Sequence, residues 1–347
     1  MSLRICSYNL EWFDDLFAPD SSLRRGKIKP DAGGFCRPGV GAFDADKRAG
    51  AIARVFQAVD ADLFGLLEAP NTKADGSKST IACLENFAAA QGLRTRKALT
   101  GYVSAGCQEL ALLYDPDKIE IQHIPGGGNR REGPRFDSTW EFDTNDDGIA
   151  EVYKFARAPL EALVTVKASG RSFRLILVHA KSKGIFSSVD MLRWQKEEER
   201  NRRRLFAECA WIRRRVDAWL EDGHPVVVMG DINDGPGMDW FELRFGKSAV
   251  DLLIGDLYQP DQILRSLGGR PRWTRNGWEP ASARFKDRVT ETYINVLIDH
   301  LLVSADLAAT ASSHRVWNPY QERNLAGLKS DLNAASDHFP VSLDIDP

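Results

Sequence analysis

The chain has 347 residues, of which 43% are hydrophobic and 27% are charged, which is ordinary for a soluble globular protein. Its net charge of −3 argues against a protein that holds nucleic acid by bulk electrostatics, although it leaves room for a local basic groove. No apolar run approaches the roughly 18 residues that a membrane-spanning helix needs, so we expect no membrane insertion.

The five cysteines are widely spaced and form no CxxC pair, which is typical of free thiols in a reducing compartment. The N-terminus enters a strand without a basic-then-apolar signal, so we expect a cytoplasmic location. Length alone would allow about two domains, but no Pro/Ser-rich linker or charge block divides the chain. We expect one domain over residues 1–347, a monomer, and long loops at about 15–45 and 265–290.

The first half of the chain alternates strands and helices. The pattern predicts a strand at 4–10, a helix at 46–59, a strand at 62–68, a helix closing over 86–91 and a strand at 109–115. The helical spacing of Ile52, Val55 and Val59 indicates the first helix. The segment 18–43 is rich in Gly, Pro and cations, and connections of this length are usually functional or disordered.

The second half mixes hairpins with helical crossovers. It predicts hairpin strands at 135–142 and 152–167, a strand at 173–183, a long helix at 190–220, and strands at 224–234, 296–304 and 336–345. Hairpins combined with crossovers favour a layered α/β sandwich over a purely parallel sheet.

Polar residues recur at or near the ends of these apolar strands. They are Asn9, Glu68, His179, Asp231, Asn233, Asp299 and His338. A carboxylate beside a water-excluded core costs several kcal/mol unless a metal, a cation or a hydrogen-bond network meets it. A turn cap explains any one of these residues, but the same placement so many times favours convergence on one site for metal-assisted hydrolysis.

The residue types fit that chemistry. Hard oxygen ligands such as Glu68, Asn9 and Asp337 suit Mg²⁺ or Mn²⁺, and no Cys/His cluster suits zinc. A histidine whose second ring nitrogen is held by a carboxylate can take a proton from water near neutral pH. His338 therefore stands out as the candidate base.

Six short motifs, in order SYNLEWF, LLE, VHAKS, GDIND, IDHLLVS and SDHFP, carry a resemblance that covers residues 9–341. Together they resemble the successive motifs of the endonuclease/exonuclease/phosphatase family. The resemblance implies the deoxyribonuclease I-like fold, an α/β four-layered sandwich of two packed mixed β-sheets flanked by helices.

By position, the resemblance implies a role for each matching residue. Glu68 matches the principal ligand of Mg²⁺ (or Mn²⁺), helped by Asn9 and Asp337, and Glu11 leaves open whether one or two metals bind. The catalytic group would comprise His338 as base, Asp299 as the carboxylate that orients it, and Asp231 with Asn233 beside the nucleophile or the phosphate. Arg157 and His179 resemble the pair that grips the scissile phosphate.

Lys183 follows His179 in a Lys-Ser-Lys run, from which its ammonium group would reach a phosphate; the alternative is a polar loop. The turn at Asp143–Asp147 invites a Ca²⁺ interpretation because acidic or amide side chains alternate before Gly148. It lacks the acidic twelfth residue and the flanking helices of an EF-hand, so a capped hairpin turn is the better interpretation.

The substrate carries phosphate, and two classes fit. Residues 268–288 interleave cations with Trp273, Trp278 and Phe285, a composition that holds single strands or splayed bases of DNA or RNA, unless the tryptophans simply pack on the core. We therefore expect a nuclease. The alternative is a hydrolase of a small phosphoester such as an inositol phosphate, a nucleotide or a phospholipid head group, and a non-catalytic binding module comes third.

Overall fold

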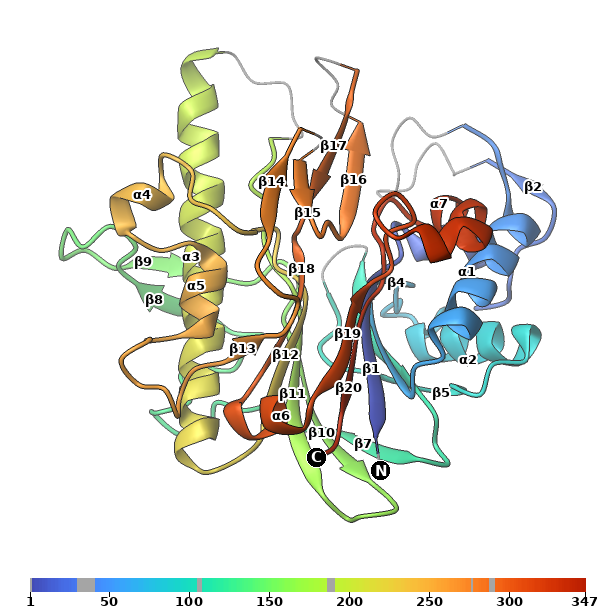
Figure 1. Ribbon diagram of the computed structural model, residues 1–347, viewed down its shortest axis with the longest axis horizontal. Coiled ribbons are helices and arrows are strands. Elements are labelled where there is room, and N and C mark those ends of the chain that lie inside the picture. Colours follow the sequence, from blue (N-terminus) through green and yellow to red (C-terminus); the bar gives the residue numbers. More distant parts are fainter. Residues whose placement is uncertain (1, 30–40, 105–107, 186–190, 276, 287–290) are drawn as a thin grey trace.

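Two six-stranded mixed β-sheets lie face to face in the centre of the molecule (Figure 1). The computed structural model describes residues 2–29, 41–104, 108–185, 191–275, 277–286 and 291–347. No helix in these ranges is long and apolar enough to cross a membrane.

The first sheet contains the N- and C-terminal strands. Its order is β19 (Ser312–Val316), β20 (Val341–Ile345), β1 (Leu3–Asn9), β4 (Leu63–Ala69), β6 (Glu109–Tyr114) and β5 (Lys97–Thr100). β1 and β4 are parallel, whereas β20 is antiparallel to β1. The chain therefore leaves β1 at the same edge at which it enters β20.

The second sheet is built in the same way. Its order is β13 (Arg265–Ser266), β18 (Asp299–Val303), β12 (Val226–Asp231), β11 (Ser172–His179), β10 (Leu160–Val166) and β7 (Ile119–His123). β11 and β12 are parallel, and β18 is antiparallel to β12. The ends of β11 and β12 and the start of β18 therefore share one edge.

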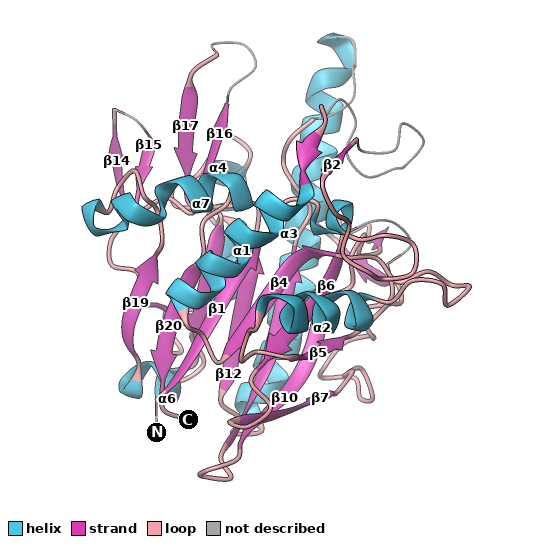
Figure 2. Ribbon diagram, turned by 90° about the vertical axis from the view of Figure 1, so that its right-hand side faces the viewer, coloured by secondary structure: helices cyan, strands magenta, loops and turns pink. Residues whose placement is uncertain are grey.

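Helices cover the outer face of each sheet (Figure 2). The first sheet packs against α1 (Ala45–Val59), α2 (Thr80–Gln91) and α7 (Lys329–Ala335), and the second against α3 (Met191–Glu221) and α5 (Ala249–Ile254). Short helices complete the chain: η1 (Phe13–Leu16), α4 (Glu242–Phe245), α6 (Ala305–Thr310) and η2 (Arg323–Leu328). The predicted four-layered sandwich is confirmed.

The predicted strand at 152–167 is two strands. β8 (Trp140–Phe142) and β9 (Glu151–Tyr153) form the expected hairpin, but β10 pairs with β7 and β11 in the second sheet. The break precedes Pro159, which has no N–H to donate to a ladder.

The segment at 265–290 was predicted to be a loop, and that prediction is wrong for most of it. β14 (Arg272–Thr274), β15 (Gly277–Glu279), β16 (Ala283–Lys286) and β17 (Tyr293–Val296) form a small four-stranded sheet above the main ones (Figure 1). Cross-strand contacts such as that of Trp273 with Trp278 replace the predicted irregular structure. Within the other predicted loop, β2 (Lys27–Ile28) pairs with β3 (Phe43–Asp44), and residues 30–40 lie outside the described ranges.

The two main sheets approach closely at Gly65 on β4. A Cβ at this position would lie 2.4 Å from Met229 Cε and 2.7 Å from Leu177 Cδ1, both on the facing sheet. Contacts this short require the neighbours to move. The short distance between the two sheets therefore requires glycine, which has no side chain, at position 65.

We expect Gly65→Ala to lower the free energy of unfolding by about 1–3 kcal/mol, because the added methyl group overpacks the core. Urea unfolding of both proteins measures the difference. Gly50→Ala is the matched control, since Gly50 lies within α1 and a Cβ there would meet the flexible end of Arg54 at 3.2 Å. That control should be neutral or stabilising by up to ~1 kcal/mol. Equal stability of Gly65→Ala and wild type would contradict the packing argument.

Candidate functional site

The polar strand ends predicted from the sequence meet at one edge of the two sheets. In the second sheet, His179 lies opposite Asp231 and Asp231 lies opposite Asp299 in the strand register. Register partners project from the same face of a sheet, so these three side chains form a row. Asn9 ends β1, and His338 lies three residues before β20, at the facing edge of the first sheet.

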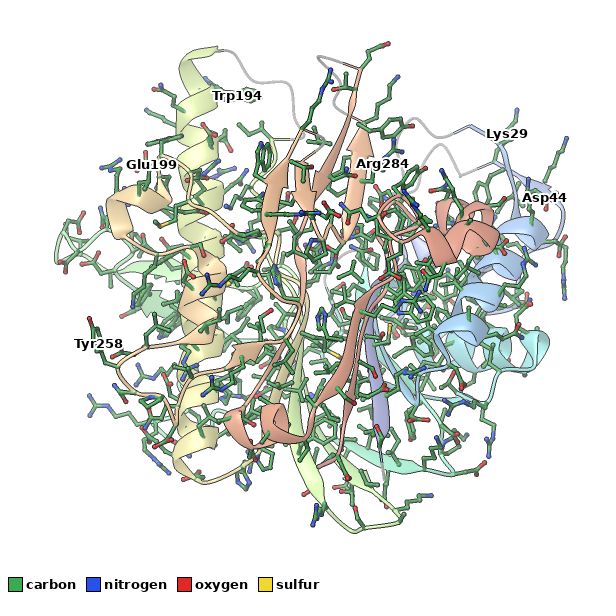
Figure 3. The ribbon with its side chains drawn as sticks, in the orientation of Figure 1. Lys29, Asp44, Trp194, Glu199, Tyr258 and Arg284 are labelled. Carbon is green, nitrogen blue, oxygen red and sulfur yellow. The ribbon has the colours of Figure 1, made fainter. Side chains whose placement is uncertain are left out.

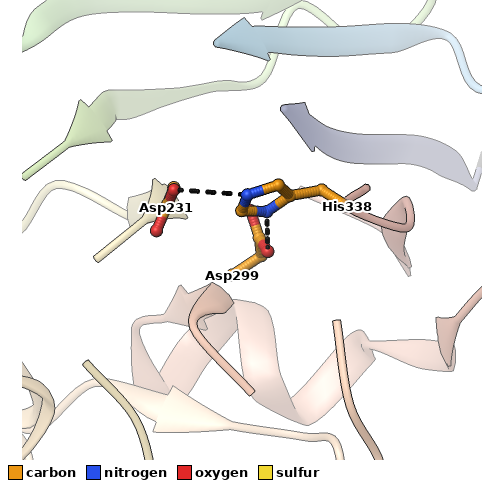
Figure 4. Close-up of side chains that lie close together, drawn as sticks. All are labelled: Asp231, Asp299 and His338. Atoms are coloured by element: carbon orange, nitrogen blue, oxygen red, sulfur yellow. Dashed lines mark hydrogen bonds and ion pairs between the residues drawn. The ribbon is translucent and has the colours of Figure 1, made fainter. Parts of the chain in front are cut away.

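His338 joins the two sheets through this row (Figure 4). Its Nδ1 lies 2.8 Å from Asp299 Oδ2, and its Nε2 lies 3.9 Å from Asp231 Oδ2. All three side chains are buried. The Asp299 contact fixes the orientation of the ring and leaves Nε2 directed at Asp231, with Asp337 Oδ1 4.0 Å away.

Asn9 connects this cluster to Glu68. Its Nδ2 donates to Asp231 Oδ2 at 3.2 Å and to Glu68 Oε1 at 3.4 Å. The backbone N–H of Trp12 donates to the other Glu68 oxygen at 2.9 Å. Glu68 has a φ of 56°, which is a strained conformation for a residue with a side chain and costs on the order of 1–3 kcal/mol. The surrounding contacts hold it there.

Arg157 lies behind His179. Its Nε donates to the carbonyl of His179 and its Nη2 to the carbonyl of Ala180, both at 3.4 Å. Its Nη1 donates to Gln108 Oε1, a contact that the sequence analysis missed. The sequence does carry one sign of this role. Gln108 directly precedes the strand β6, so it is a polar residue at a strand end like the residues predicted for the site.

Asn233 closes the turn after β12. Its backbone N–H donates to Asp231 Oδ1 at 2.8 Å, and its side chain donates to the carbonyl of Ala180 at 3.0 Å. The residue has a φ of 55°, a left-handed conformation that asparagine tolerates better than most residues. Asn233 thus orients Asp231 and holds the ends of β11 and β12 together.

Lys183 does not join this group. Its ammonium group lies 2.5 Å from Asp234 Oδ1 and contacts Glu242, with Asp239 3.8 Å away. Its charge is therefore already compensated within the protein. We therefore leave Lys183 out of the phosphate-binding set. Its acidic neighbours come from residues 234–242, which lie 51 to 59 positions further along the chain, so no local pattern predicts them.

The turn at Asp143–Asp147 uses its carboxylates within the turn. Asp143 accepts from the backbone N–H groups of Asn145 and Gly148, and Asp147 accepts from that of Ile149. These bonds are those of a capped hairpin turn between β8 and β9. They favour the hairpin interpretation over the Ca²⁺ interpretation.

Burial and neighbouring charge shift the titration of the cluster. Burial by itself lowers the pKa of His338, but the charge and hydrogen bond of Asp299, with Asp231 and Asp337, raise that pKa well above its ordinary value. Burial and the charge of Asp299 raise the pKa of Asp231 to about 7. Burial and the charge of Arg157 lower the pKa of His179 well below its ordinary value, so His179 is neutral.

The donor groups fit a hard divalent cation. Two neighbouring donor sets are present. Ligand atoms of Asp231, Asp299 and His338 all lie within 4.8 Å of one another, but a cation bound there would occupy the ring that Asp299 orients. The set predicted from the sequence, Glu68, Asn9 and Asp337, borders this cluster and would leave His338 Nε2 to act on a ligand. Asp299 Oδ1 is buried and has no hydrogen-bond partner among the described residues. Glu68 adds a carboxylate through Asn9. Carboxylate oxygens dominate both sets, and they are the ligands that Mg²⁺ and Mn²⁺ prefer.

No protein-family model and no curated protein matches the chain. A solved 3′ phosphatase from Neisseria, bound to a product DNA hairpin, is 14% identical with a TM-score of 0.50, over 99% of this chain and 100% of that chain. An endonuclease/exonuclease/phosphatase protein from Bacteroides vulgatus is 14% identical with a TM-score of 0.49, over 100% and 99%. A mannosyl-6-phosphatase from Bacteroides thetaiotaomicron is 15% identical with a TM-score of 0.48, over 99% and 100%.

The chain has the deoxyribonuclease I-like fold. The Neisseria structure shares its architecture over essentially the whole length of both chains, and the two packed mixed sheets flanked by helices are those that the six motifs imply. The fold predicted from the sequence is thereby confirmed.

We expect Asp299→Asn to lower the pKa of His338, because the substitution removes the negative charge and weakens the hydrogen bond that favour the imidazolium form. An NMR titration of the histidine ring protons in EDTA measures the change, with His338→Gln used to assign the signal. His224 lies at the far end of β12 and contacts Arg174, so its signal is an internal control. An unchanged His338 titration would show that Asp299 does not set it.

Proposed function

We propose that the protein is a metal-dependent phosphoester hydrolase of the endonuclease/exonuclease/phosphatase type, with nucleic acid as its first substrate class. The observation that carries this proposal is the buried contact of His338 with Asp299, next to Asp231 and Asn9–Glu68. A histidine held by a carboxylate in an oxygen-rich pocket is the arrangement that activation of water near a phosphate requires.

In this mechanism His338 is the general base, in the neutral form that it would take when a bound cation offsets the charge of the carboxylates that raise its pKa. Asp299 holds Nδ1, so Nε2 is the nitrogen that takes the proton from the attacking water. Glu68, Asn9 and Asp337 would hold a divalent cation, which when bound polarises the phosphate and offsets the carboxylate charge. Asp231 and Asn233 lie beside the path of the nucleophile.

Arg157 and His179 would stabilise charge on the phosphate oxygens. The lowered pKa of His179 favours its uncharged form, whereas Arg157 supplies the positive charge beside Glu68 and Asp231. The backbone carbonyls that Arg157 contacts fix its direction. Several groups are needed, because no single residue lowers the activation free energy by as much as an enzyme does.

Nucleic acid is favoured because the small sheet presents aromatic and cationic side chains above the site. Trp273 on β14 is 70% exposed, so it does not pack on the core, and this observation supports a stacking surface. The Neisseria protein of the same fold is bound to a DNA hairpin. The alternative, a small phosphoester, is supported by the cavity beside Arg284.

Hydrolysis of bis(p-nitrophenyl) phosphate tests the enzyme class. We expect activity with Mg²⁺ or Mn²⁺, its loss in EDTA, and a decrease in kcat of about 10²–10⁴ for His338→Ala because the base is removed. Glu68→Ala should reduce activity and raise the metal concentration needed. His224→Ala and Glu141→Ala are matched controls at positions away from the site. Wild type no faster than His338→Ala and Glu68→Ala with every divalent metal would refute the proposal.

A further inference from the structure

Arg284 on β16, labelled in Figure 3, contacts two tyrosine rings. Its guanidinium carbon is 3.7 Å from the ring centroid of Tyr293 on β17 and 4.0 Å from that of Tyr320, which follows β19. Rings at these distances hold a guanidinium by cation–π attraction. They cover much of its planar surface and leave its N–H edges as the groups that can bind a ligand.

The charge of Arg284 has no carboxylate partner among the described residues, although its side chain is half-buried. The nearest acid in the same cavity, Glu279, is paired with Arg272 at 2.9 Å. Lys329 lies 4.3 Å from the Tyr320 ring and adds a second positive charge. A partly desolvated arginine of this kind gains most from an anionic ligand.

A cavity of about 470 Å³ opens beside this group. It is lined by Thr274, Glu279, Arg284, Tyr293, Tyr320 and Gln321 together with Asn295. Its walls are fixed, because Gln321 donates to the carbonyl of Trp278 at 2.9 Å and accepts from the N–H of Ala281 at 2.8 Å. The Tyr320 hydroxyl donates to Asn333 at 3.2 Å.

The cavity is connected to the catalytic segment by backbone contacts. The N–H of Arg284 donates to the carbonyl of Asp337 at 2.9 Å, and Ala283 forms a β-bridge with His338. In this antiparallel bridge the side chains of Arg284 and Asp337 project from one side. The side chains of Phe285 and His338 project from the other side, where their ring centroids lie 5.5 Å apart. Arg284 is therefore in fixed register with Asp337 and His338.

We propose that Arg284 and the two tyrosines form a subsite for a second phosphate group of the substrate. The proposal rests on the proposed hydrolase function and adds to it the substrate class: a molecule with at least two phosphates, one at the catalytic histidine and one at Arg284. A planar guanidinium with free N–H edges binds two phosphate oxygens at once, which lysine cannot do. A polynucleotide and a small bisphosphate both supply this chemistry.

Binding measured by calorimetry with Mg²⁺ tests the subsite with two probes, and every protein compared carries His338→Ala to suppress hydrolysis. The probes are a thymidine tetranucleotide and fructose 1,6-bisphosphate, compared for the wild-type residue at 284, Arg284→Gln, Arg284→Lys and Arg131→Gln. We expect Arg284→Gln to weaken one probe about tenfold, the loss of a charge-assisted bidentate contact. Arg284→Lys should recover only part of that loss, and Arg131→Gln should change nothing, because Arg131 is exposed and paired with Glu221 and Asp222, which do not line the cavity.

The outcomes separate the two sources of the second phosphate, and they separate failure of the subsite from failure of the hydrolase function. Selective weakening of the tetranucleotide identifies a polynucleotide substrate, and selective weakening of the bisphosphate identifies a small one. If neither probe binds the protein that keeps Arg284, or if Arg284→Gln binds both as that protein does, the subsite is refuted. Hydrolysis of bis(p-nitrophenyl) phosphate, which carries one phosphate, still reports on the hydrolase in that case.

Discussion

The burial of Asp231 and Asp299 side by side is the constraint on which the site depends. Their strands are antiparallel neighbours in exact register, so the backbone ladder brings two carboxylates together where water is excluded. Two buried like charges are unfavourable unless donors surround them, which is why the pKa of Asp231 rises. His338 and Asn9 supply those donors from the opposite sheet, so the site exists only where both sheets meet.

Ser282, which directly precedes β16 of the small sheet, helps to hold Asp299 and His338 in place. Its hydroxyl accepts from the N–H of Asp299 at 2.9 Å and from that of Ile298 at 3.0 Å, and its carbonyl accepts from the N–H of Phe339 at 2.6 Å. One residue thus holds the segments that carry Asp299 and His338. The small sheet, which lines the proposed substrate path, therefore also supports the Asp299–His338 pair.

The sequence was sufficient to predict the main sheets and the convergence of polar residues, because each lies at the end of a strongly apolar strand. It was insufficient wherever the outcome depended on contacts between distant segments. The charge of Lys183 is compensated by Asp234 and Glu242, and Gln108 reaches Arg157 from another sheet. Neither contact leaves a local pattern, and the strands of the small sheet are too short to show a clear period.

The charge balance of the site supports the proposal that it holds a divalent cation. Asp231, Asp299, Glu68 and Asp337 lie around a space in which Arg157 and His338 are the nearby basic groups, and Arg157 is directed by carbonyls toward the ends of β11. A phosphate is itself an anion, so it would meet net repulsion from these carboxylates in a medium of low dielectric constant. A divalent cation reverses the sign of that interaction, and Arg284 offers a second attraction outside the carboxylate group. The substrate would therefore be held by two positive centres of different origin, a bound ion at the strand ends and a fixed guanidinium on the small sheet.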